Sequence, residues 1–80
     1  MLNRLSEAQL RALEMLDAAG FSGRTQAVML ASGIKPATID TLVRAGLATA
    51  TAELVRAGGL AIEIVDIRIT DTGRAALSTD

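Results

Sequence analysis

Apolar side chains recur at helical spacing in the first part of the chain. Three leucines stand three positions apart and the charged residues nearby fall largely on the other face, which predicts an amphipathic helix packed on a core: Leu10, Leu13 and Leu16. Ser6 and Gln9 have the spacing of a capping box, which places the start of this helix at Glu7. Gly20 is expected to end it, and Phe21, the only aromatic residue, to fold back onto the core.

Two shorter helices joined by a turn are predicted next. The first of them runs from Arg24 or Thr25 to Ser32, before a glycine that suits a helix end. The other starts at Pro36, because proline lacks the N–H that a first helical turn leaves unpaired, and runs to Ala45. Its core-facing residues lie three and four positions apart: Ile39, Leu42 and Val43. Two short helices connected in this way match the outline of a helix-turn-helix.

The periodicity changes after Leu47, where alternating and β-branched residues replace the helical pattern. We expect two strands, at residues 48–57 and 62–69, joined by a two-residue hairpin turn at Gly58-Gly59. In the second strand the apolar side chains change from even to odd positions near Val65. Since side chains alternate between the faces of a strand, this change predicts either a β-bulge or a strand covered on both faces by a second subunit.

An alternative stays open for residues 48–57. The sequence LVRAG at residues 42–46 recurs twelve positions later at residues 54–58. If the first copy ends a helix, the second copy is compatible with a helix end as well. Two copies of five residues do not establish a repeat architecture, however, and the hairpin is the favoured interpretation.

The last predicted element is a helix capped by Thr70, with Asp71 in the first turn, where the helix dipole favours a negative charge. Residues 70–77 (TDTGRAAL) have the form Thr-x-x-Gly-Arg-x-x-Leu. Together with the short helices, the Gly-Leu stop and the hairpin, this segment resembles the winged helix-turn-helix family of small bacterial or prophage transcriptional regulators. The resemblance implies an α+β fold, mainly α, with three helices, a two-stranded β-hairpin wing and a short C-terminal helix, in a single domain over residues 1–80.

The resemblance also implies a function, which is binding to double-stranded DNA in transcription regulation with residues 36–45 as the recognition helix. Cations near the two short helices would then hold phosphates, threonines would meet base edges, and an aspartate would accept a hydrogen bond from cytosine N4. An arginine near the hairpin tip would serve the wing. The candidate DNA-binding residues are Arg24, Lys35, Thr38, Asp40, Thr41, Arg44 and Arg56.

The charge balance limits this hypothesis. The chain has 8 Lys and Arg against 9 Asp and Glu, a net charge of -1, whereas DNA affinity depends on cations that displace counterions from phosphates. The alternative is a winged-helix protein-interaction or dimerisation module without DNA binding, in which the Leu2–Leu5 end and the second strand are buried against a partner, for example in a homodimer. The strand residues concerned are Ile62, Ile64, Val65 and Ile67.

Other classes of function lack the residues that they need. The chain contains no histidine, cysteine or tyrosine, so we expect no enzyme activity, no metal site and no cofactor. No apolar run approaches the roughly 20 residues of a membrane-spanning helix, and polar residues near the N-terminus stand where a signal peptide needs an apolar core. The sequence therefore predicts a cytoplasmic protein without a membrane partner.

Overall fold

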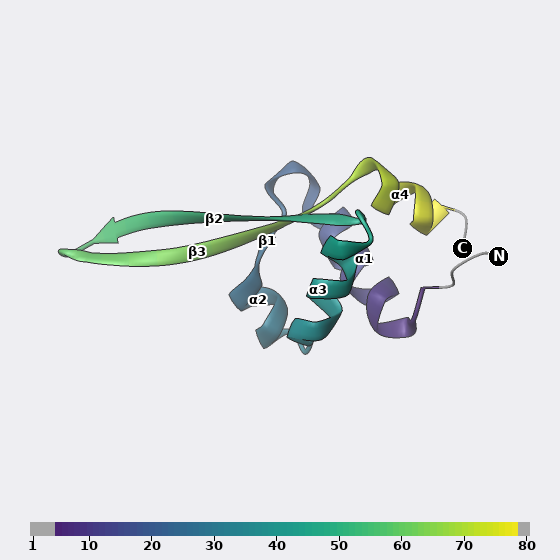
Figure 1. Cartoon of the computed structure of the whole chain (residues 1–80), viewed down its shortest axis with the longest axis horizontal. Helices are drawn as coiled ribbons and strands as arrows, with labels where there is room; N and C mark the ends of the chain where they lie inside the picture. The colour runs from purple at the N-terminus through teal and green to yellow at the C-terminus, as the bar shows by residue number, and fades with distance from the viewer. Residues whose placement is uncertain (1–4, 79–80) are drawn as a thin grey trace.

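The computed structural model describes residues 5–78, and within them the chain forms four α-helices and a three-stranded antiparallel sheet (Figure 1). The elements in chain order are α1 (Glu7–Ala19), a 3₁₀ turn (Gly20–Ser22), β1 (Arg24–Thr25), α2 (Gln26–Ala31), α3 (Pro36–Arg44), β2 (Ala48–Ala57), β3 (Leu60–Ile69) and α4 (Asp71–Ser78). The strands lie in the order β1-β3-β2. The fold is α+β and mostly helical, as predicted, but this part of the chain has three strands where the sequence indicated two.

Capping residues set the helix ends close to where the sequence predicted them. The Ser6 hydroxyl accepts a hydrogen bond from the Gln9 amide at 3.1 Å, and the Gln9 side chain accepts one from the Ser6 amide at 2.8 Å, which completes the capping box of α1. Thr70 caps α4 by accepting from the Gly73 amide at 3.0 Å. Helix α3 ends at Arg44, one residue before the predicted end. Local sequence signals are therefore enough to place these ends.

The additional strand β1 precedes the second helix and shortens it. Arg24 and Thr25 pair with β3, where Arg24 lies opposite Ile67, and α2 begins only at Gln26. Gly23 permits this pairing, because a Cβ at that position would collide with the carbonyl oxygen of Ile67. The predicted helix start at Arg24 or Thr25 is thus one or two residues early, since a long-range strand pairing takes these residues.

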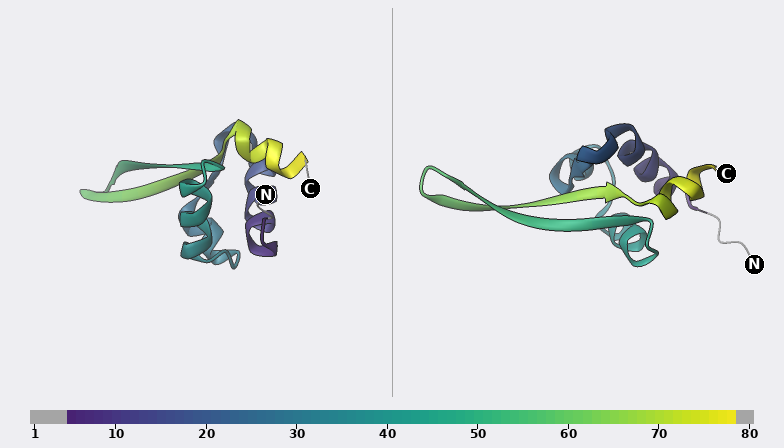
Figure 2. Two further views of the ribbon diagram at one scale, coloured as in Figure 1. Left: turned by 45° about the vertical axis from the view of Figure 1, so that its right-hand side comes forward. Right: turned by 90° about the horizontal axis from the view of Figure 1, so that it is seen from above.

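The core is aliphatic and lies between the helices and the base of the β2–β3 hairpin (Figure 2). Its buried side chains are Ala12, Leu13, Leu16, Met29, Ile34, Ile39, Leu42, Leu47, Ala48, Ile67 and Ile69. Leu5 is partly buried and packs against this core, and Leu2 lies outside the described residues. Phe21 is 92% exposed, because the turn brings Gly23 rather than Phe21 against β3. The prediction that Phe21 folds back onto the core is wrong.

Strands β2 and β3 form a long hairpin whose far end extends beyond the helices (Figures 1 and 2). Pairing is continuous over both strands, so residues 48–57 are a strand and the alternative of a helix is wrong. Gly58 and Gly59 have φ angles of 57° and 83°, as a two-residue type I′ turn requires. The hairpin makes the molecule elongated, with extents of 51 × 21 × 20 Å. We call residues 53–64 the arm.

The change of apolar parity in β3 does not arise from a β-bulge. Every residue of β2 lies opposite one residue of β3, and Val65, where the parity changes, faces Ala52 within this unbroken register. A bulge would place two residues of one strand opposite a single residue of the other. The bulge hypothesis is therefore wrong, and coverage of both faces by a second subunit stays a prediction.

Candidate nucleic-acid interface

A tight turn at residues 32–35 connects α2 to α3. The Ile34 amide donates to the Met29 carbonyl at 3.0 Å, and both side chains are buried in the core. Gly33 has a φ of 95°, in the left-handed region that favours glycine. Lys35 is the N-cap of α3 and makes no side-chain capping hydrogen bond. The turn therefore fixes the start of α3 by core packing and leaves its N-terminal end open to solvent.

Helix α3 has one face in the core and one face in solvent. Ile39 and Leu42 are buried, and α3 packs against α1 and β2 through this side. Ala37, Asp40 and Arg44 are exposed and lie on the opposite side at three- and four-residue spacing. This uncovered face is the surface that a recognition helix would present to a groove of DNA.

The centre of this face holds an ion pair. The Arg44 Nε lies 3.0 Å from Asp40 Oδ2, at the i,i+4 spacing, and both side chains are exposed. Exposed helical pairs of this kind contribute only about 0.3–0.5 kcal/mol. Arg44 is therefore available to another anion at low cost, but Asp40 reduces the positive potential that the face presents.

The two candidate threonines differ in exposure. Thr41 is exposed and borders the face that carries Asp40 and Arg44, whereas Thr38 is half-buried. The Thr41 hydroxyl donates to the Thr38 carbonyl at 2.7 Å and accepts from the Gln9 Nε2 of α1 at 3.2 Å. The hydroxyl of Thr41 is thus used within the protein, although its side chain is open to solvent.

The remaining candidate cations are spread over separate elements. Arg24 is exposed on β1, Lys35 is exposed just before α3, and Arg56 is exposed near the tip of the arm. The arm also carries Glu53 and Glu63. Its one cation against two carboxylates makes the arm net negative, so it does not present a basic wing to phosphates.

Arg68 is a further cation that the sequence patterns did not indicate. It is exposed on β3, and its Cγ lies 2.7 Å from the position that a Cβ on Gly23 would take. Arg24 lies opposite Ile67, so the side chains of Arg24 and Arg68 lie on opposite faces of the sheet. The two arginines therefore do not form one basic surface.

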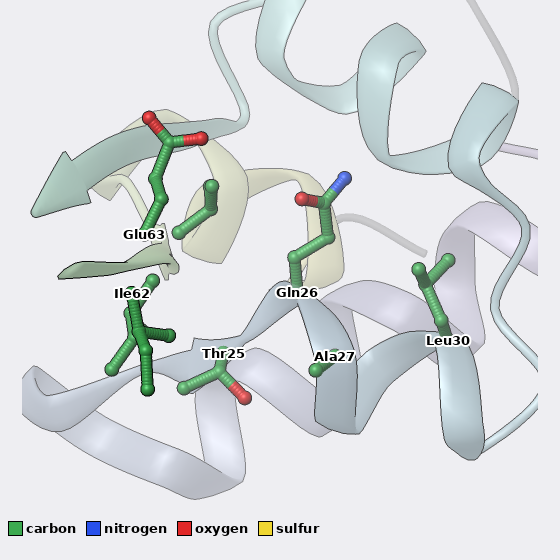
Figure 3. A pocket seen from close by; sticks show the side chains of 8 residues that line it. Thr25, Gln26, Ala27, Leu30, Ile62 and Glu63 are labelled. Carbon is green, nitrogen blue, oxygen red and sulfur yellow. The ribbon is translucent and has the colours of Figure 1, made fainter. Parts of the chain in front are cut away.

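A groove of about 370 Å³ lies between α2 and β3 (Figure 3). Its lining includes Thr25, Gln26, Ala27, Leu30, Ile62 and Glu63. The lining is mainly aliphatic, with one carboxylate and no paired acid and base. The groove therefore offers an apolar surface and does not assemble a group for nucleophilic or acid–base catalysis.

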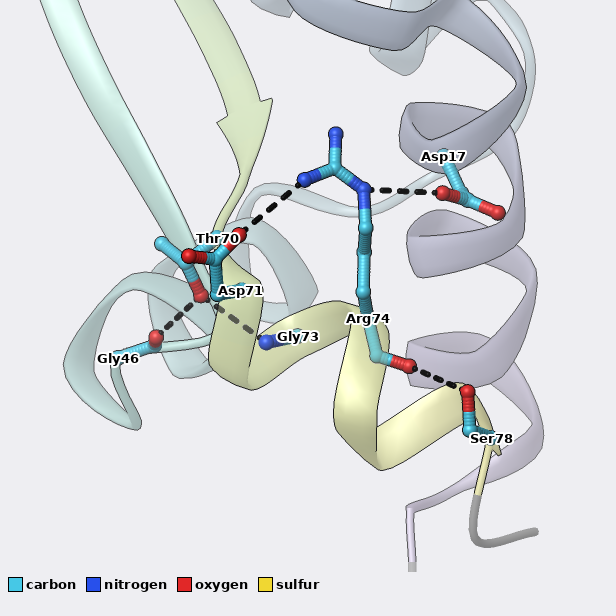
Figure 4. A network of polar contacts seen from close by, with 7 residues as sticks. All are labelled: Asp17, Gly46, Thr70, Asp71, Gly73, Arg74 and Ser78. Atoms are coloured by element: carbon cyan, nitrogen blue, oxygen red, sulfur yellow. Dashed lines mark hydrogen bonds and ion pairs between the residues drawn. The ribbon is translucent and has the colours of Figure 1, made fainter.

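The Thr-x-x-Gly-Arg segment fastens α4 to the rest of the domain (Figure 4). The Thr70 hydroxyl donates to the Gly46 carbonyl at 2.7 Å, which ties the start of α4 to the turn after α3. Arg74 Nε lies 3.3 Å from Asp17 of α1, and its Nη1 lies 3.4 Å from Asp71. Arg74 is thus engaged by two carboxylates, and the segment has a structural role.

Residues 5–78 offer neither a metal-ion site nor a membrane-spanning helix. Among residues 5–78, no three His, Cys, Asp or Glu side chains form a group that could hold a metal ion. None of the helices described is both long enough and apolar enough to cross a membrane.

Comparison with protein-family models, with curated proteins and with solved structures finds no match to this chain.

Proposed function

We propose that the chain is a winged helix-turn-helix domain that binds double-stranded DNA as a small transcriptional regulator, with α3 as its recognition helix. The order α1-β1-α2-α3-β2-β3-α4 and the sheet order β1-β3-β2 support the assignment of the fold. The observation that carries the function is the uncovered face of α3, which follows a tight turn and is covered by no other element within residues 5–78. Helices in this position enter the major groove of DNA in helix-turn-helix proteins.

In this complex a few cationic side chains would contact phosphates, and the ion-paired side chains of Asp40 and Arg44 would reach the base edges. Lys35 at the start of α3 and Arg24 on β1 would hold phosphates. Arg44 would meet a guanine or a phosphate, and Asp40 would accept from cytosine N4 while repelling misplaced phosphates. With about three phosphate contacts, the logarithm of affinity would fall with the logarithm of salt concentration at a slope of about −3.

Fluorescence anisotropy with a labelled random-sequence duplex tests this proposal. At about 50 mM salt, micromolar protein should bind the duplex, and binding should be lost as salt is raised. Arg44→Ala should weaken binding about 10-fold, in line with the loss of one charged contact. Arg11→Ala is the matched control, because Arg11 is exposed on the side of α1 opposite the buried Leu13 and Leu16. Absence of binding at low salt would refute DNA binding, and equal effects of the two variants would refute the assignment of α3.

A second candidate function is a protein-interaction or dimerisation module that does not bind DNA. The observation that favours it is the exposure of large aliphatic side chains on the arm, among them Leu54 at 71% and Leu60 at 68%. Exposed apolar side chains gathered on one projection of a small domain mark an interaction site. The acidic balance of the arm also favours a protein partner over a phosphate backbone.

A further inference from the structure

The two faces of the arm carry different side chains. Because the β2–β3 register is unbroken, residues that pair across the strands share a face, and successive pairs alternate between faces. The pair Ala48 and Ile69 is buried at the base and defines an inner face that packs on the core. The outer face consists of the pairs Thr49–Arg68, Thr51–Asp66, Glu53–Ile64, Val55–Ile62 and Ala57–Leu60.

The outer face changes from polar to apolar along its length. The two pairs nearest the helices are polar, whereas the three pairs of the arm contain Val55, Leu60, Ile62 and Ile64. Three of these four large side chains are exposed, and Ile62 and Ile64 also line the groove between α2 and β3. The result is an apolar patch at the free end of the hairpin, on the face opposite the one that continues the core.

The charges of the arm exclude a phosphate surface as the occupant of this patch. Glu53 and Glu63 outnumber Arg56, the one cation of the arm. DNA and anionic lipid surfaces both attract cationic segments and repel net negative ones. The arm also lacks the aromatic side chains that anchor proteins at a membrane interface. The chemistry of the patch therefore fits a protein surface.

We propose that the occupant is a second copy of this chain, and that two arms pack outer face to outer face, antiparallel, about a two-fold axis through the pair Val55–Ile62. Around this axis Val55 and Ile62 each face their own copies, and the pair Ala57–Leu60 faces the pair Glu53–Ile64 of the other copy. Self-complementary faces of this kind are what a two-fold dimer requires.

The side chains of the patch match one another in this arrangement. Along β3 the run Leu60, Ile62 and Ile64 meets the same run in reverse, so aliphatic side chains oppose aliphatic side chains throughout. Along β2 the small side chain of Ala57 lies opposite Glu53, which leaves room for the longer side chain to reach solvent at the rim. The charged residue is thus accommodated at the edge of the interface.

The polar pair Thr51–Asp66, which adjoins the apolar patch on the outer face, disfavours other positions of the two-fold axis. Moving the axis one pair towards the helices, to Glu53–Ile64, would place Asp66 against Ile62 of the other copy. Burial of an unpaired carboxylate against aliphatic side chains is strongly unfavourable. With the axis at Val55–Ile62, the overlap is confined to the arm, whose far end extends beyond the helices (Figure 1). The two sets of helices would then lie at opposite ends of the paired arms.

The expected dimer is weak. Five residues of a strand span about 17 Å and two paired strands are about 10 Å wide, so the interface falls below the ~1,200 Å² of standard stable complexes. We therefore expect a dissociation constant in the micromolar range or weaker. The inference deepens the second candidate function and does not depend on DNA binding, so its test contains no DNA and the two proposals can fail separately.

Sedimentation velocity of the full chain, over a concentration series up to about 1 mM, tests the proposal. The wild type should shift from monomer to dimer. Ile62→Lys should weaken the dimer at least 10-fold, since it places like charges face to face at the axis. Leu54→Lys is the matched control, because Leu54 is more exposed than Ile62 and neighbours Val55, but lies on the inner face. This control should sediment as the wild type does.

Three outcomes would overturn the proposal: a monomer at every concentration, equal weakening by both lysine variants, or a dimer that Ile62→Lys leaves intact. Circular dichroism melting curves establish that each variant is folded, and Val55→Lys replaces Ile62→Lys if the latter unfolds. As an independent readout, Val55→Cys should be linked to its copy by a short bis-maleimide more efficiently than Leu54→Cys, since the natural chain contains no cysteine. Equal linking of the two variants would also contradict the arrangement.

Discussion

Replacing Gly73 by alanine is expected to destabilise the domain, although alanine is the better helix former. Gly73 is a buried residue of α4, close to the connection between α3 and β2. A Cβ at this position would collide with the Leu47 carbonyl oxygen and would lie 2.7 Å from the Ile69 Cγ1. Both neighbours belong to the core-facing base of the hairpin, so neither can move as a flexible side-chain end would.

The magnitude follows from three opposing contributions. Glycine to alanine within a helix gains about 1 kcal/mol of intrinsic propensity. Overpacking of a close contact costs about 1–3 kcal/mol. A shift of α4 would also strain the hydrogen bonds of the Thr70 hydroxyl to Gly46 and Gly73, each worth about 1 kcal/mol. We expect a net loss of about 2 kcal/mol in the free energy of unfolding, or about 10 °C in Tm for a domain of this size.

Thermal and urea denaturation followed by circular dichroism provide the assay. Thr72→Ala is the matched control, because Thr72 is the exposed neighbour of Gly73 in α4 and gains helix propensity without meeting another element. Its Tm should equal or slightly exceed that of the wild type. If Gly73→Ala were as stable as the wild type or more stable, the close packing of α4 on the Leu47 carbonyl would be refuted.

Three further variants test other parts of the structure. Leu13→Ala should lower the free energy of unfolding by about 2–5 kcal/mol in urea titrations, because Leu13 is fully buried; a loss below 1 kcal/mol would contradict its place in the core. Arg74→Ala removes two solvent-exposed ion pairs and should cost less than about 1 kcal/mol, a difference that differential scanning fluorimetry should find reduced in 1 M salt. Asp40→Asn should raise affinity for random duplex several-fold in anisotropy titrations at low salt, and an unchanged affinity would place Asp40 away from DNA.

The parts of the fold that the sequence predicted correctly depend on local signals. The capping box at Ser6 and the turn at Gly58-Gly59 each act within a few residues of the chain, and the structure has both. Proline at the start of α3 and the threonine cap of α4 belong to the same class. Such signals place the ends of elements because the hydrogen bonds involved close over three or four residues.

The features that the sequence analysis missed depend on contacts between distant residues. β1 exists because Gly23 allows the chain to approach Ile67, more than forty positions away. The hydrogen bond between Thr41 and Gln9 of α1 also joins residues that are far apart in the sequence. Phe21 is expected on the core from its place just after the helix end at Gly20, but Gly23 approaches β3 instead and Phe21 stays exposed. The contacts that decide these features join different elements, so no window of local sequence contains the information.

The hydrogen bond from the Thr70 hydroxyl to the Gly46 carbonyl lies at the base of the hairpin. The length of the hairpin beyond its base can therefore change without a change in the helices. Ala48, Ile67 and Ile69 at the base of the hairpin belong to the buried core, whereas none of the buried core residues lies in the arm. Deleting two residues from each strand, such as Val55 and Arg56 with Ala61 and Ile62, would keep every remaining side chain on its own face, whereas deleting one from each would invert the tip. The hairpin of this domain could accordingly be lengthened or shortened in steps of four residues without a change in the core or in the face on which each side chain lies.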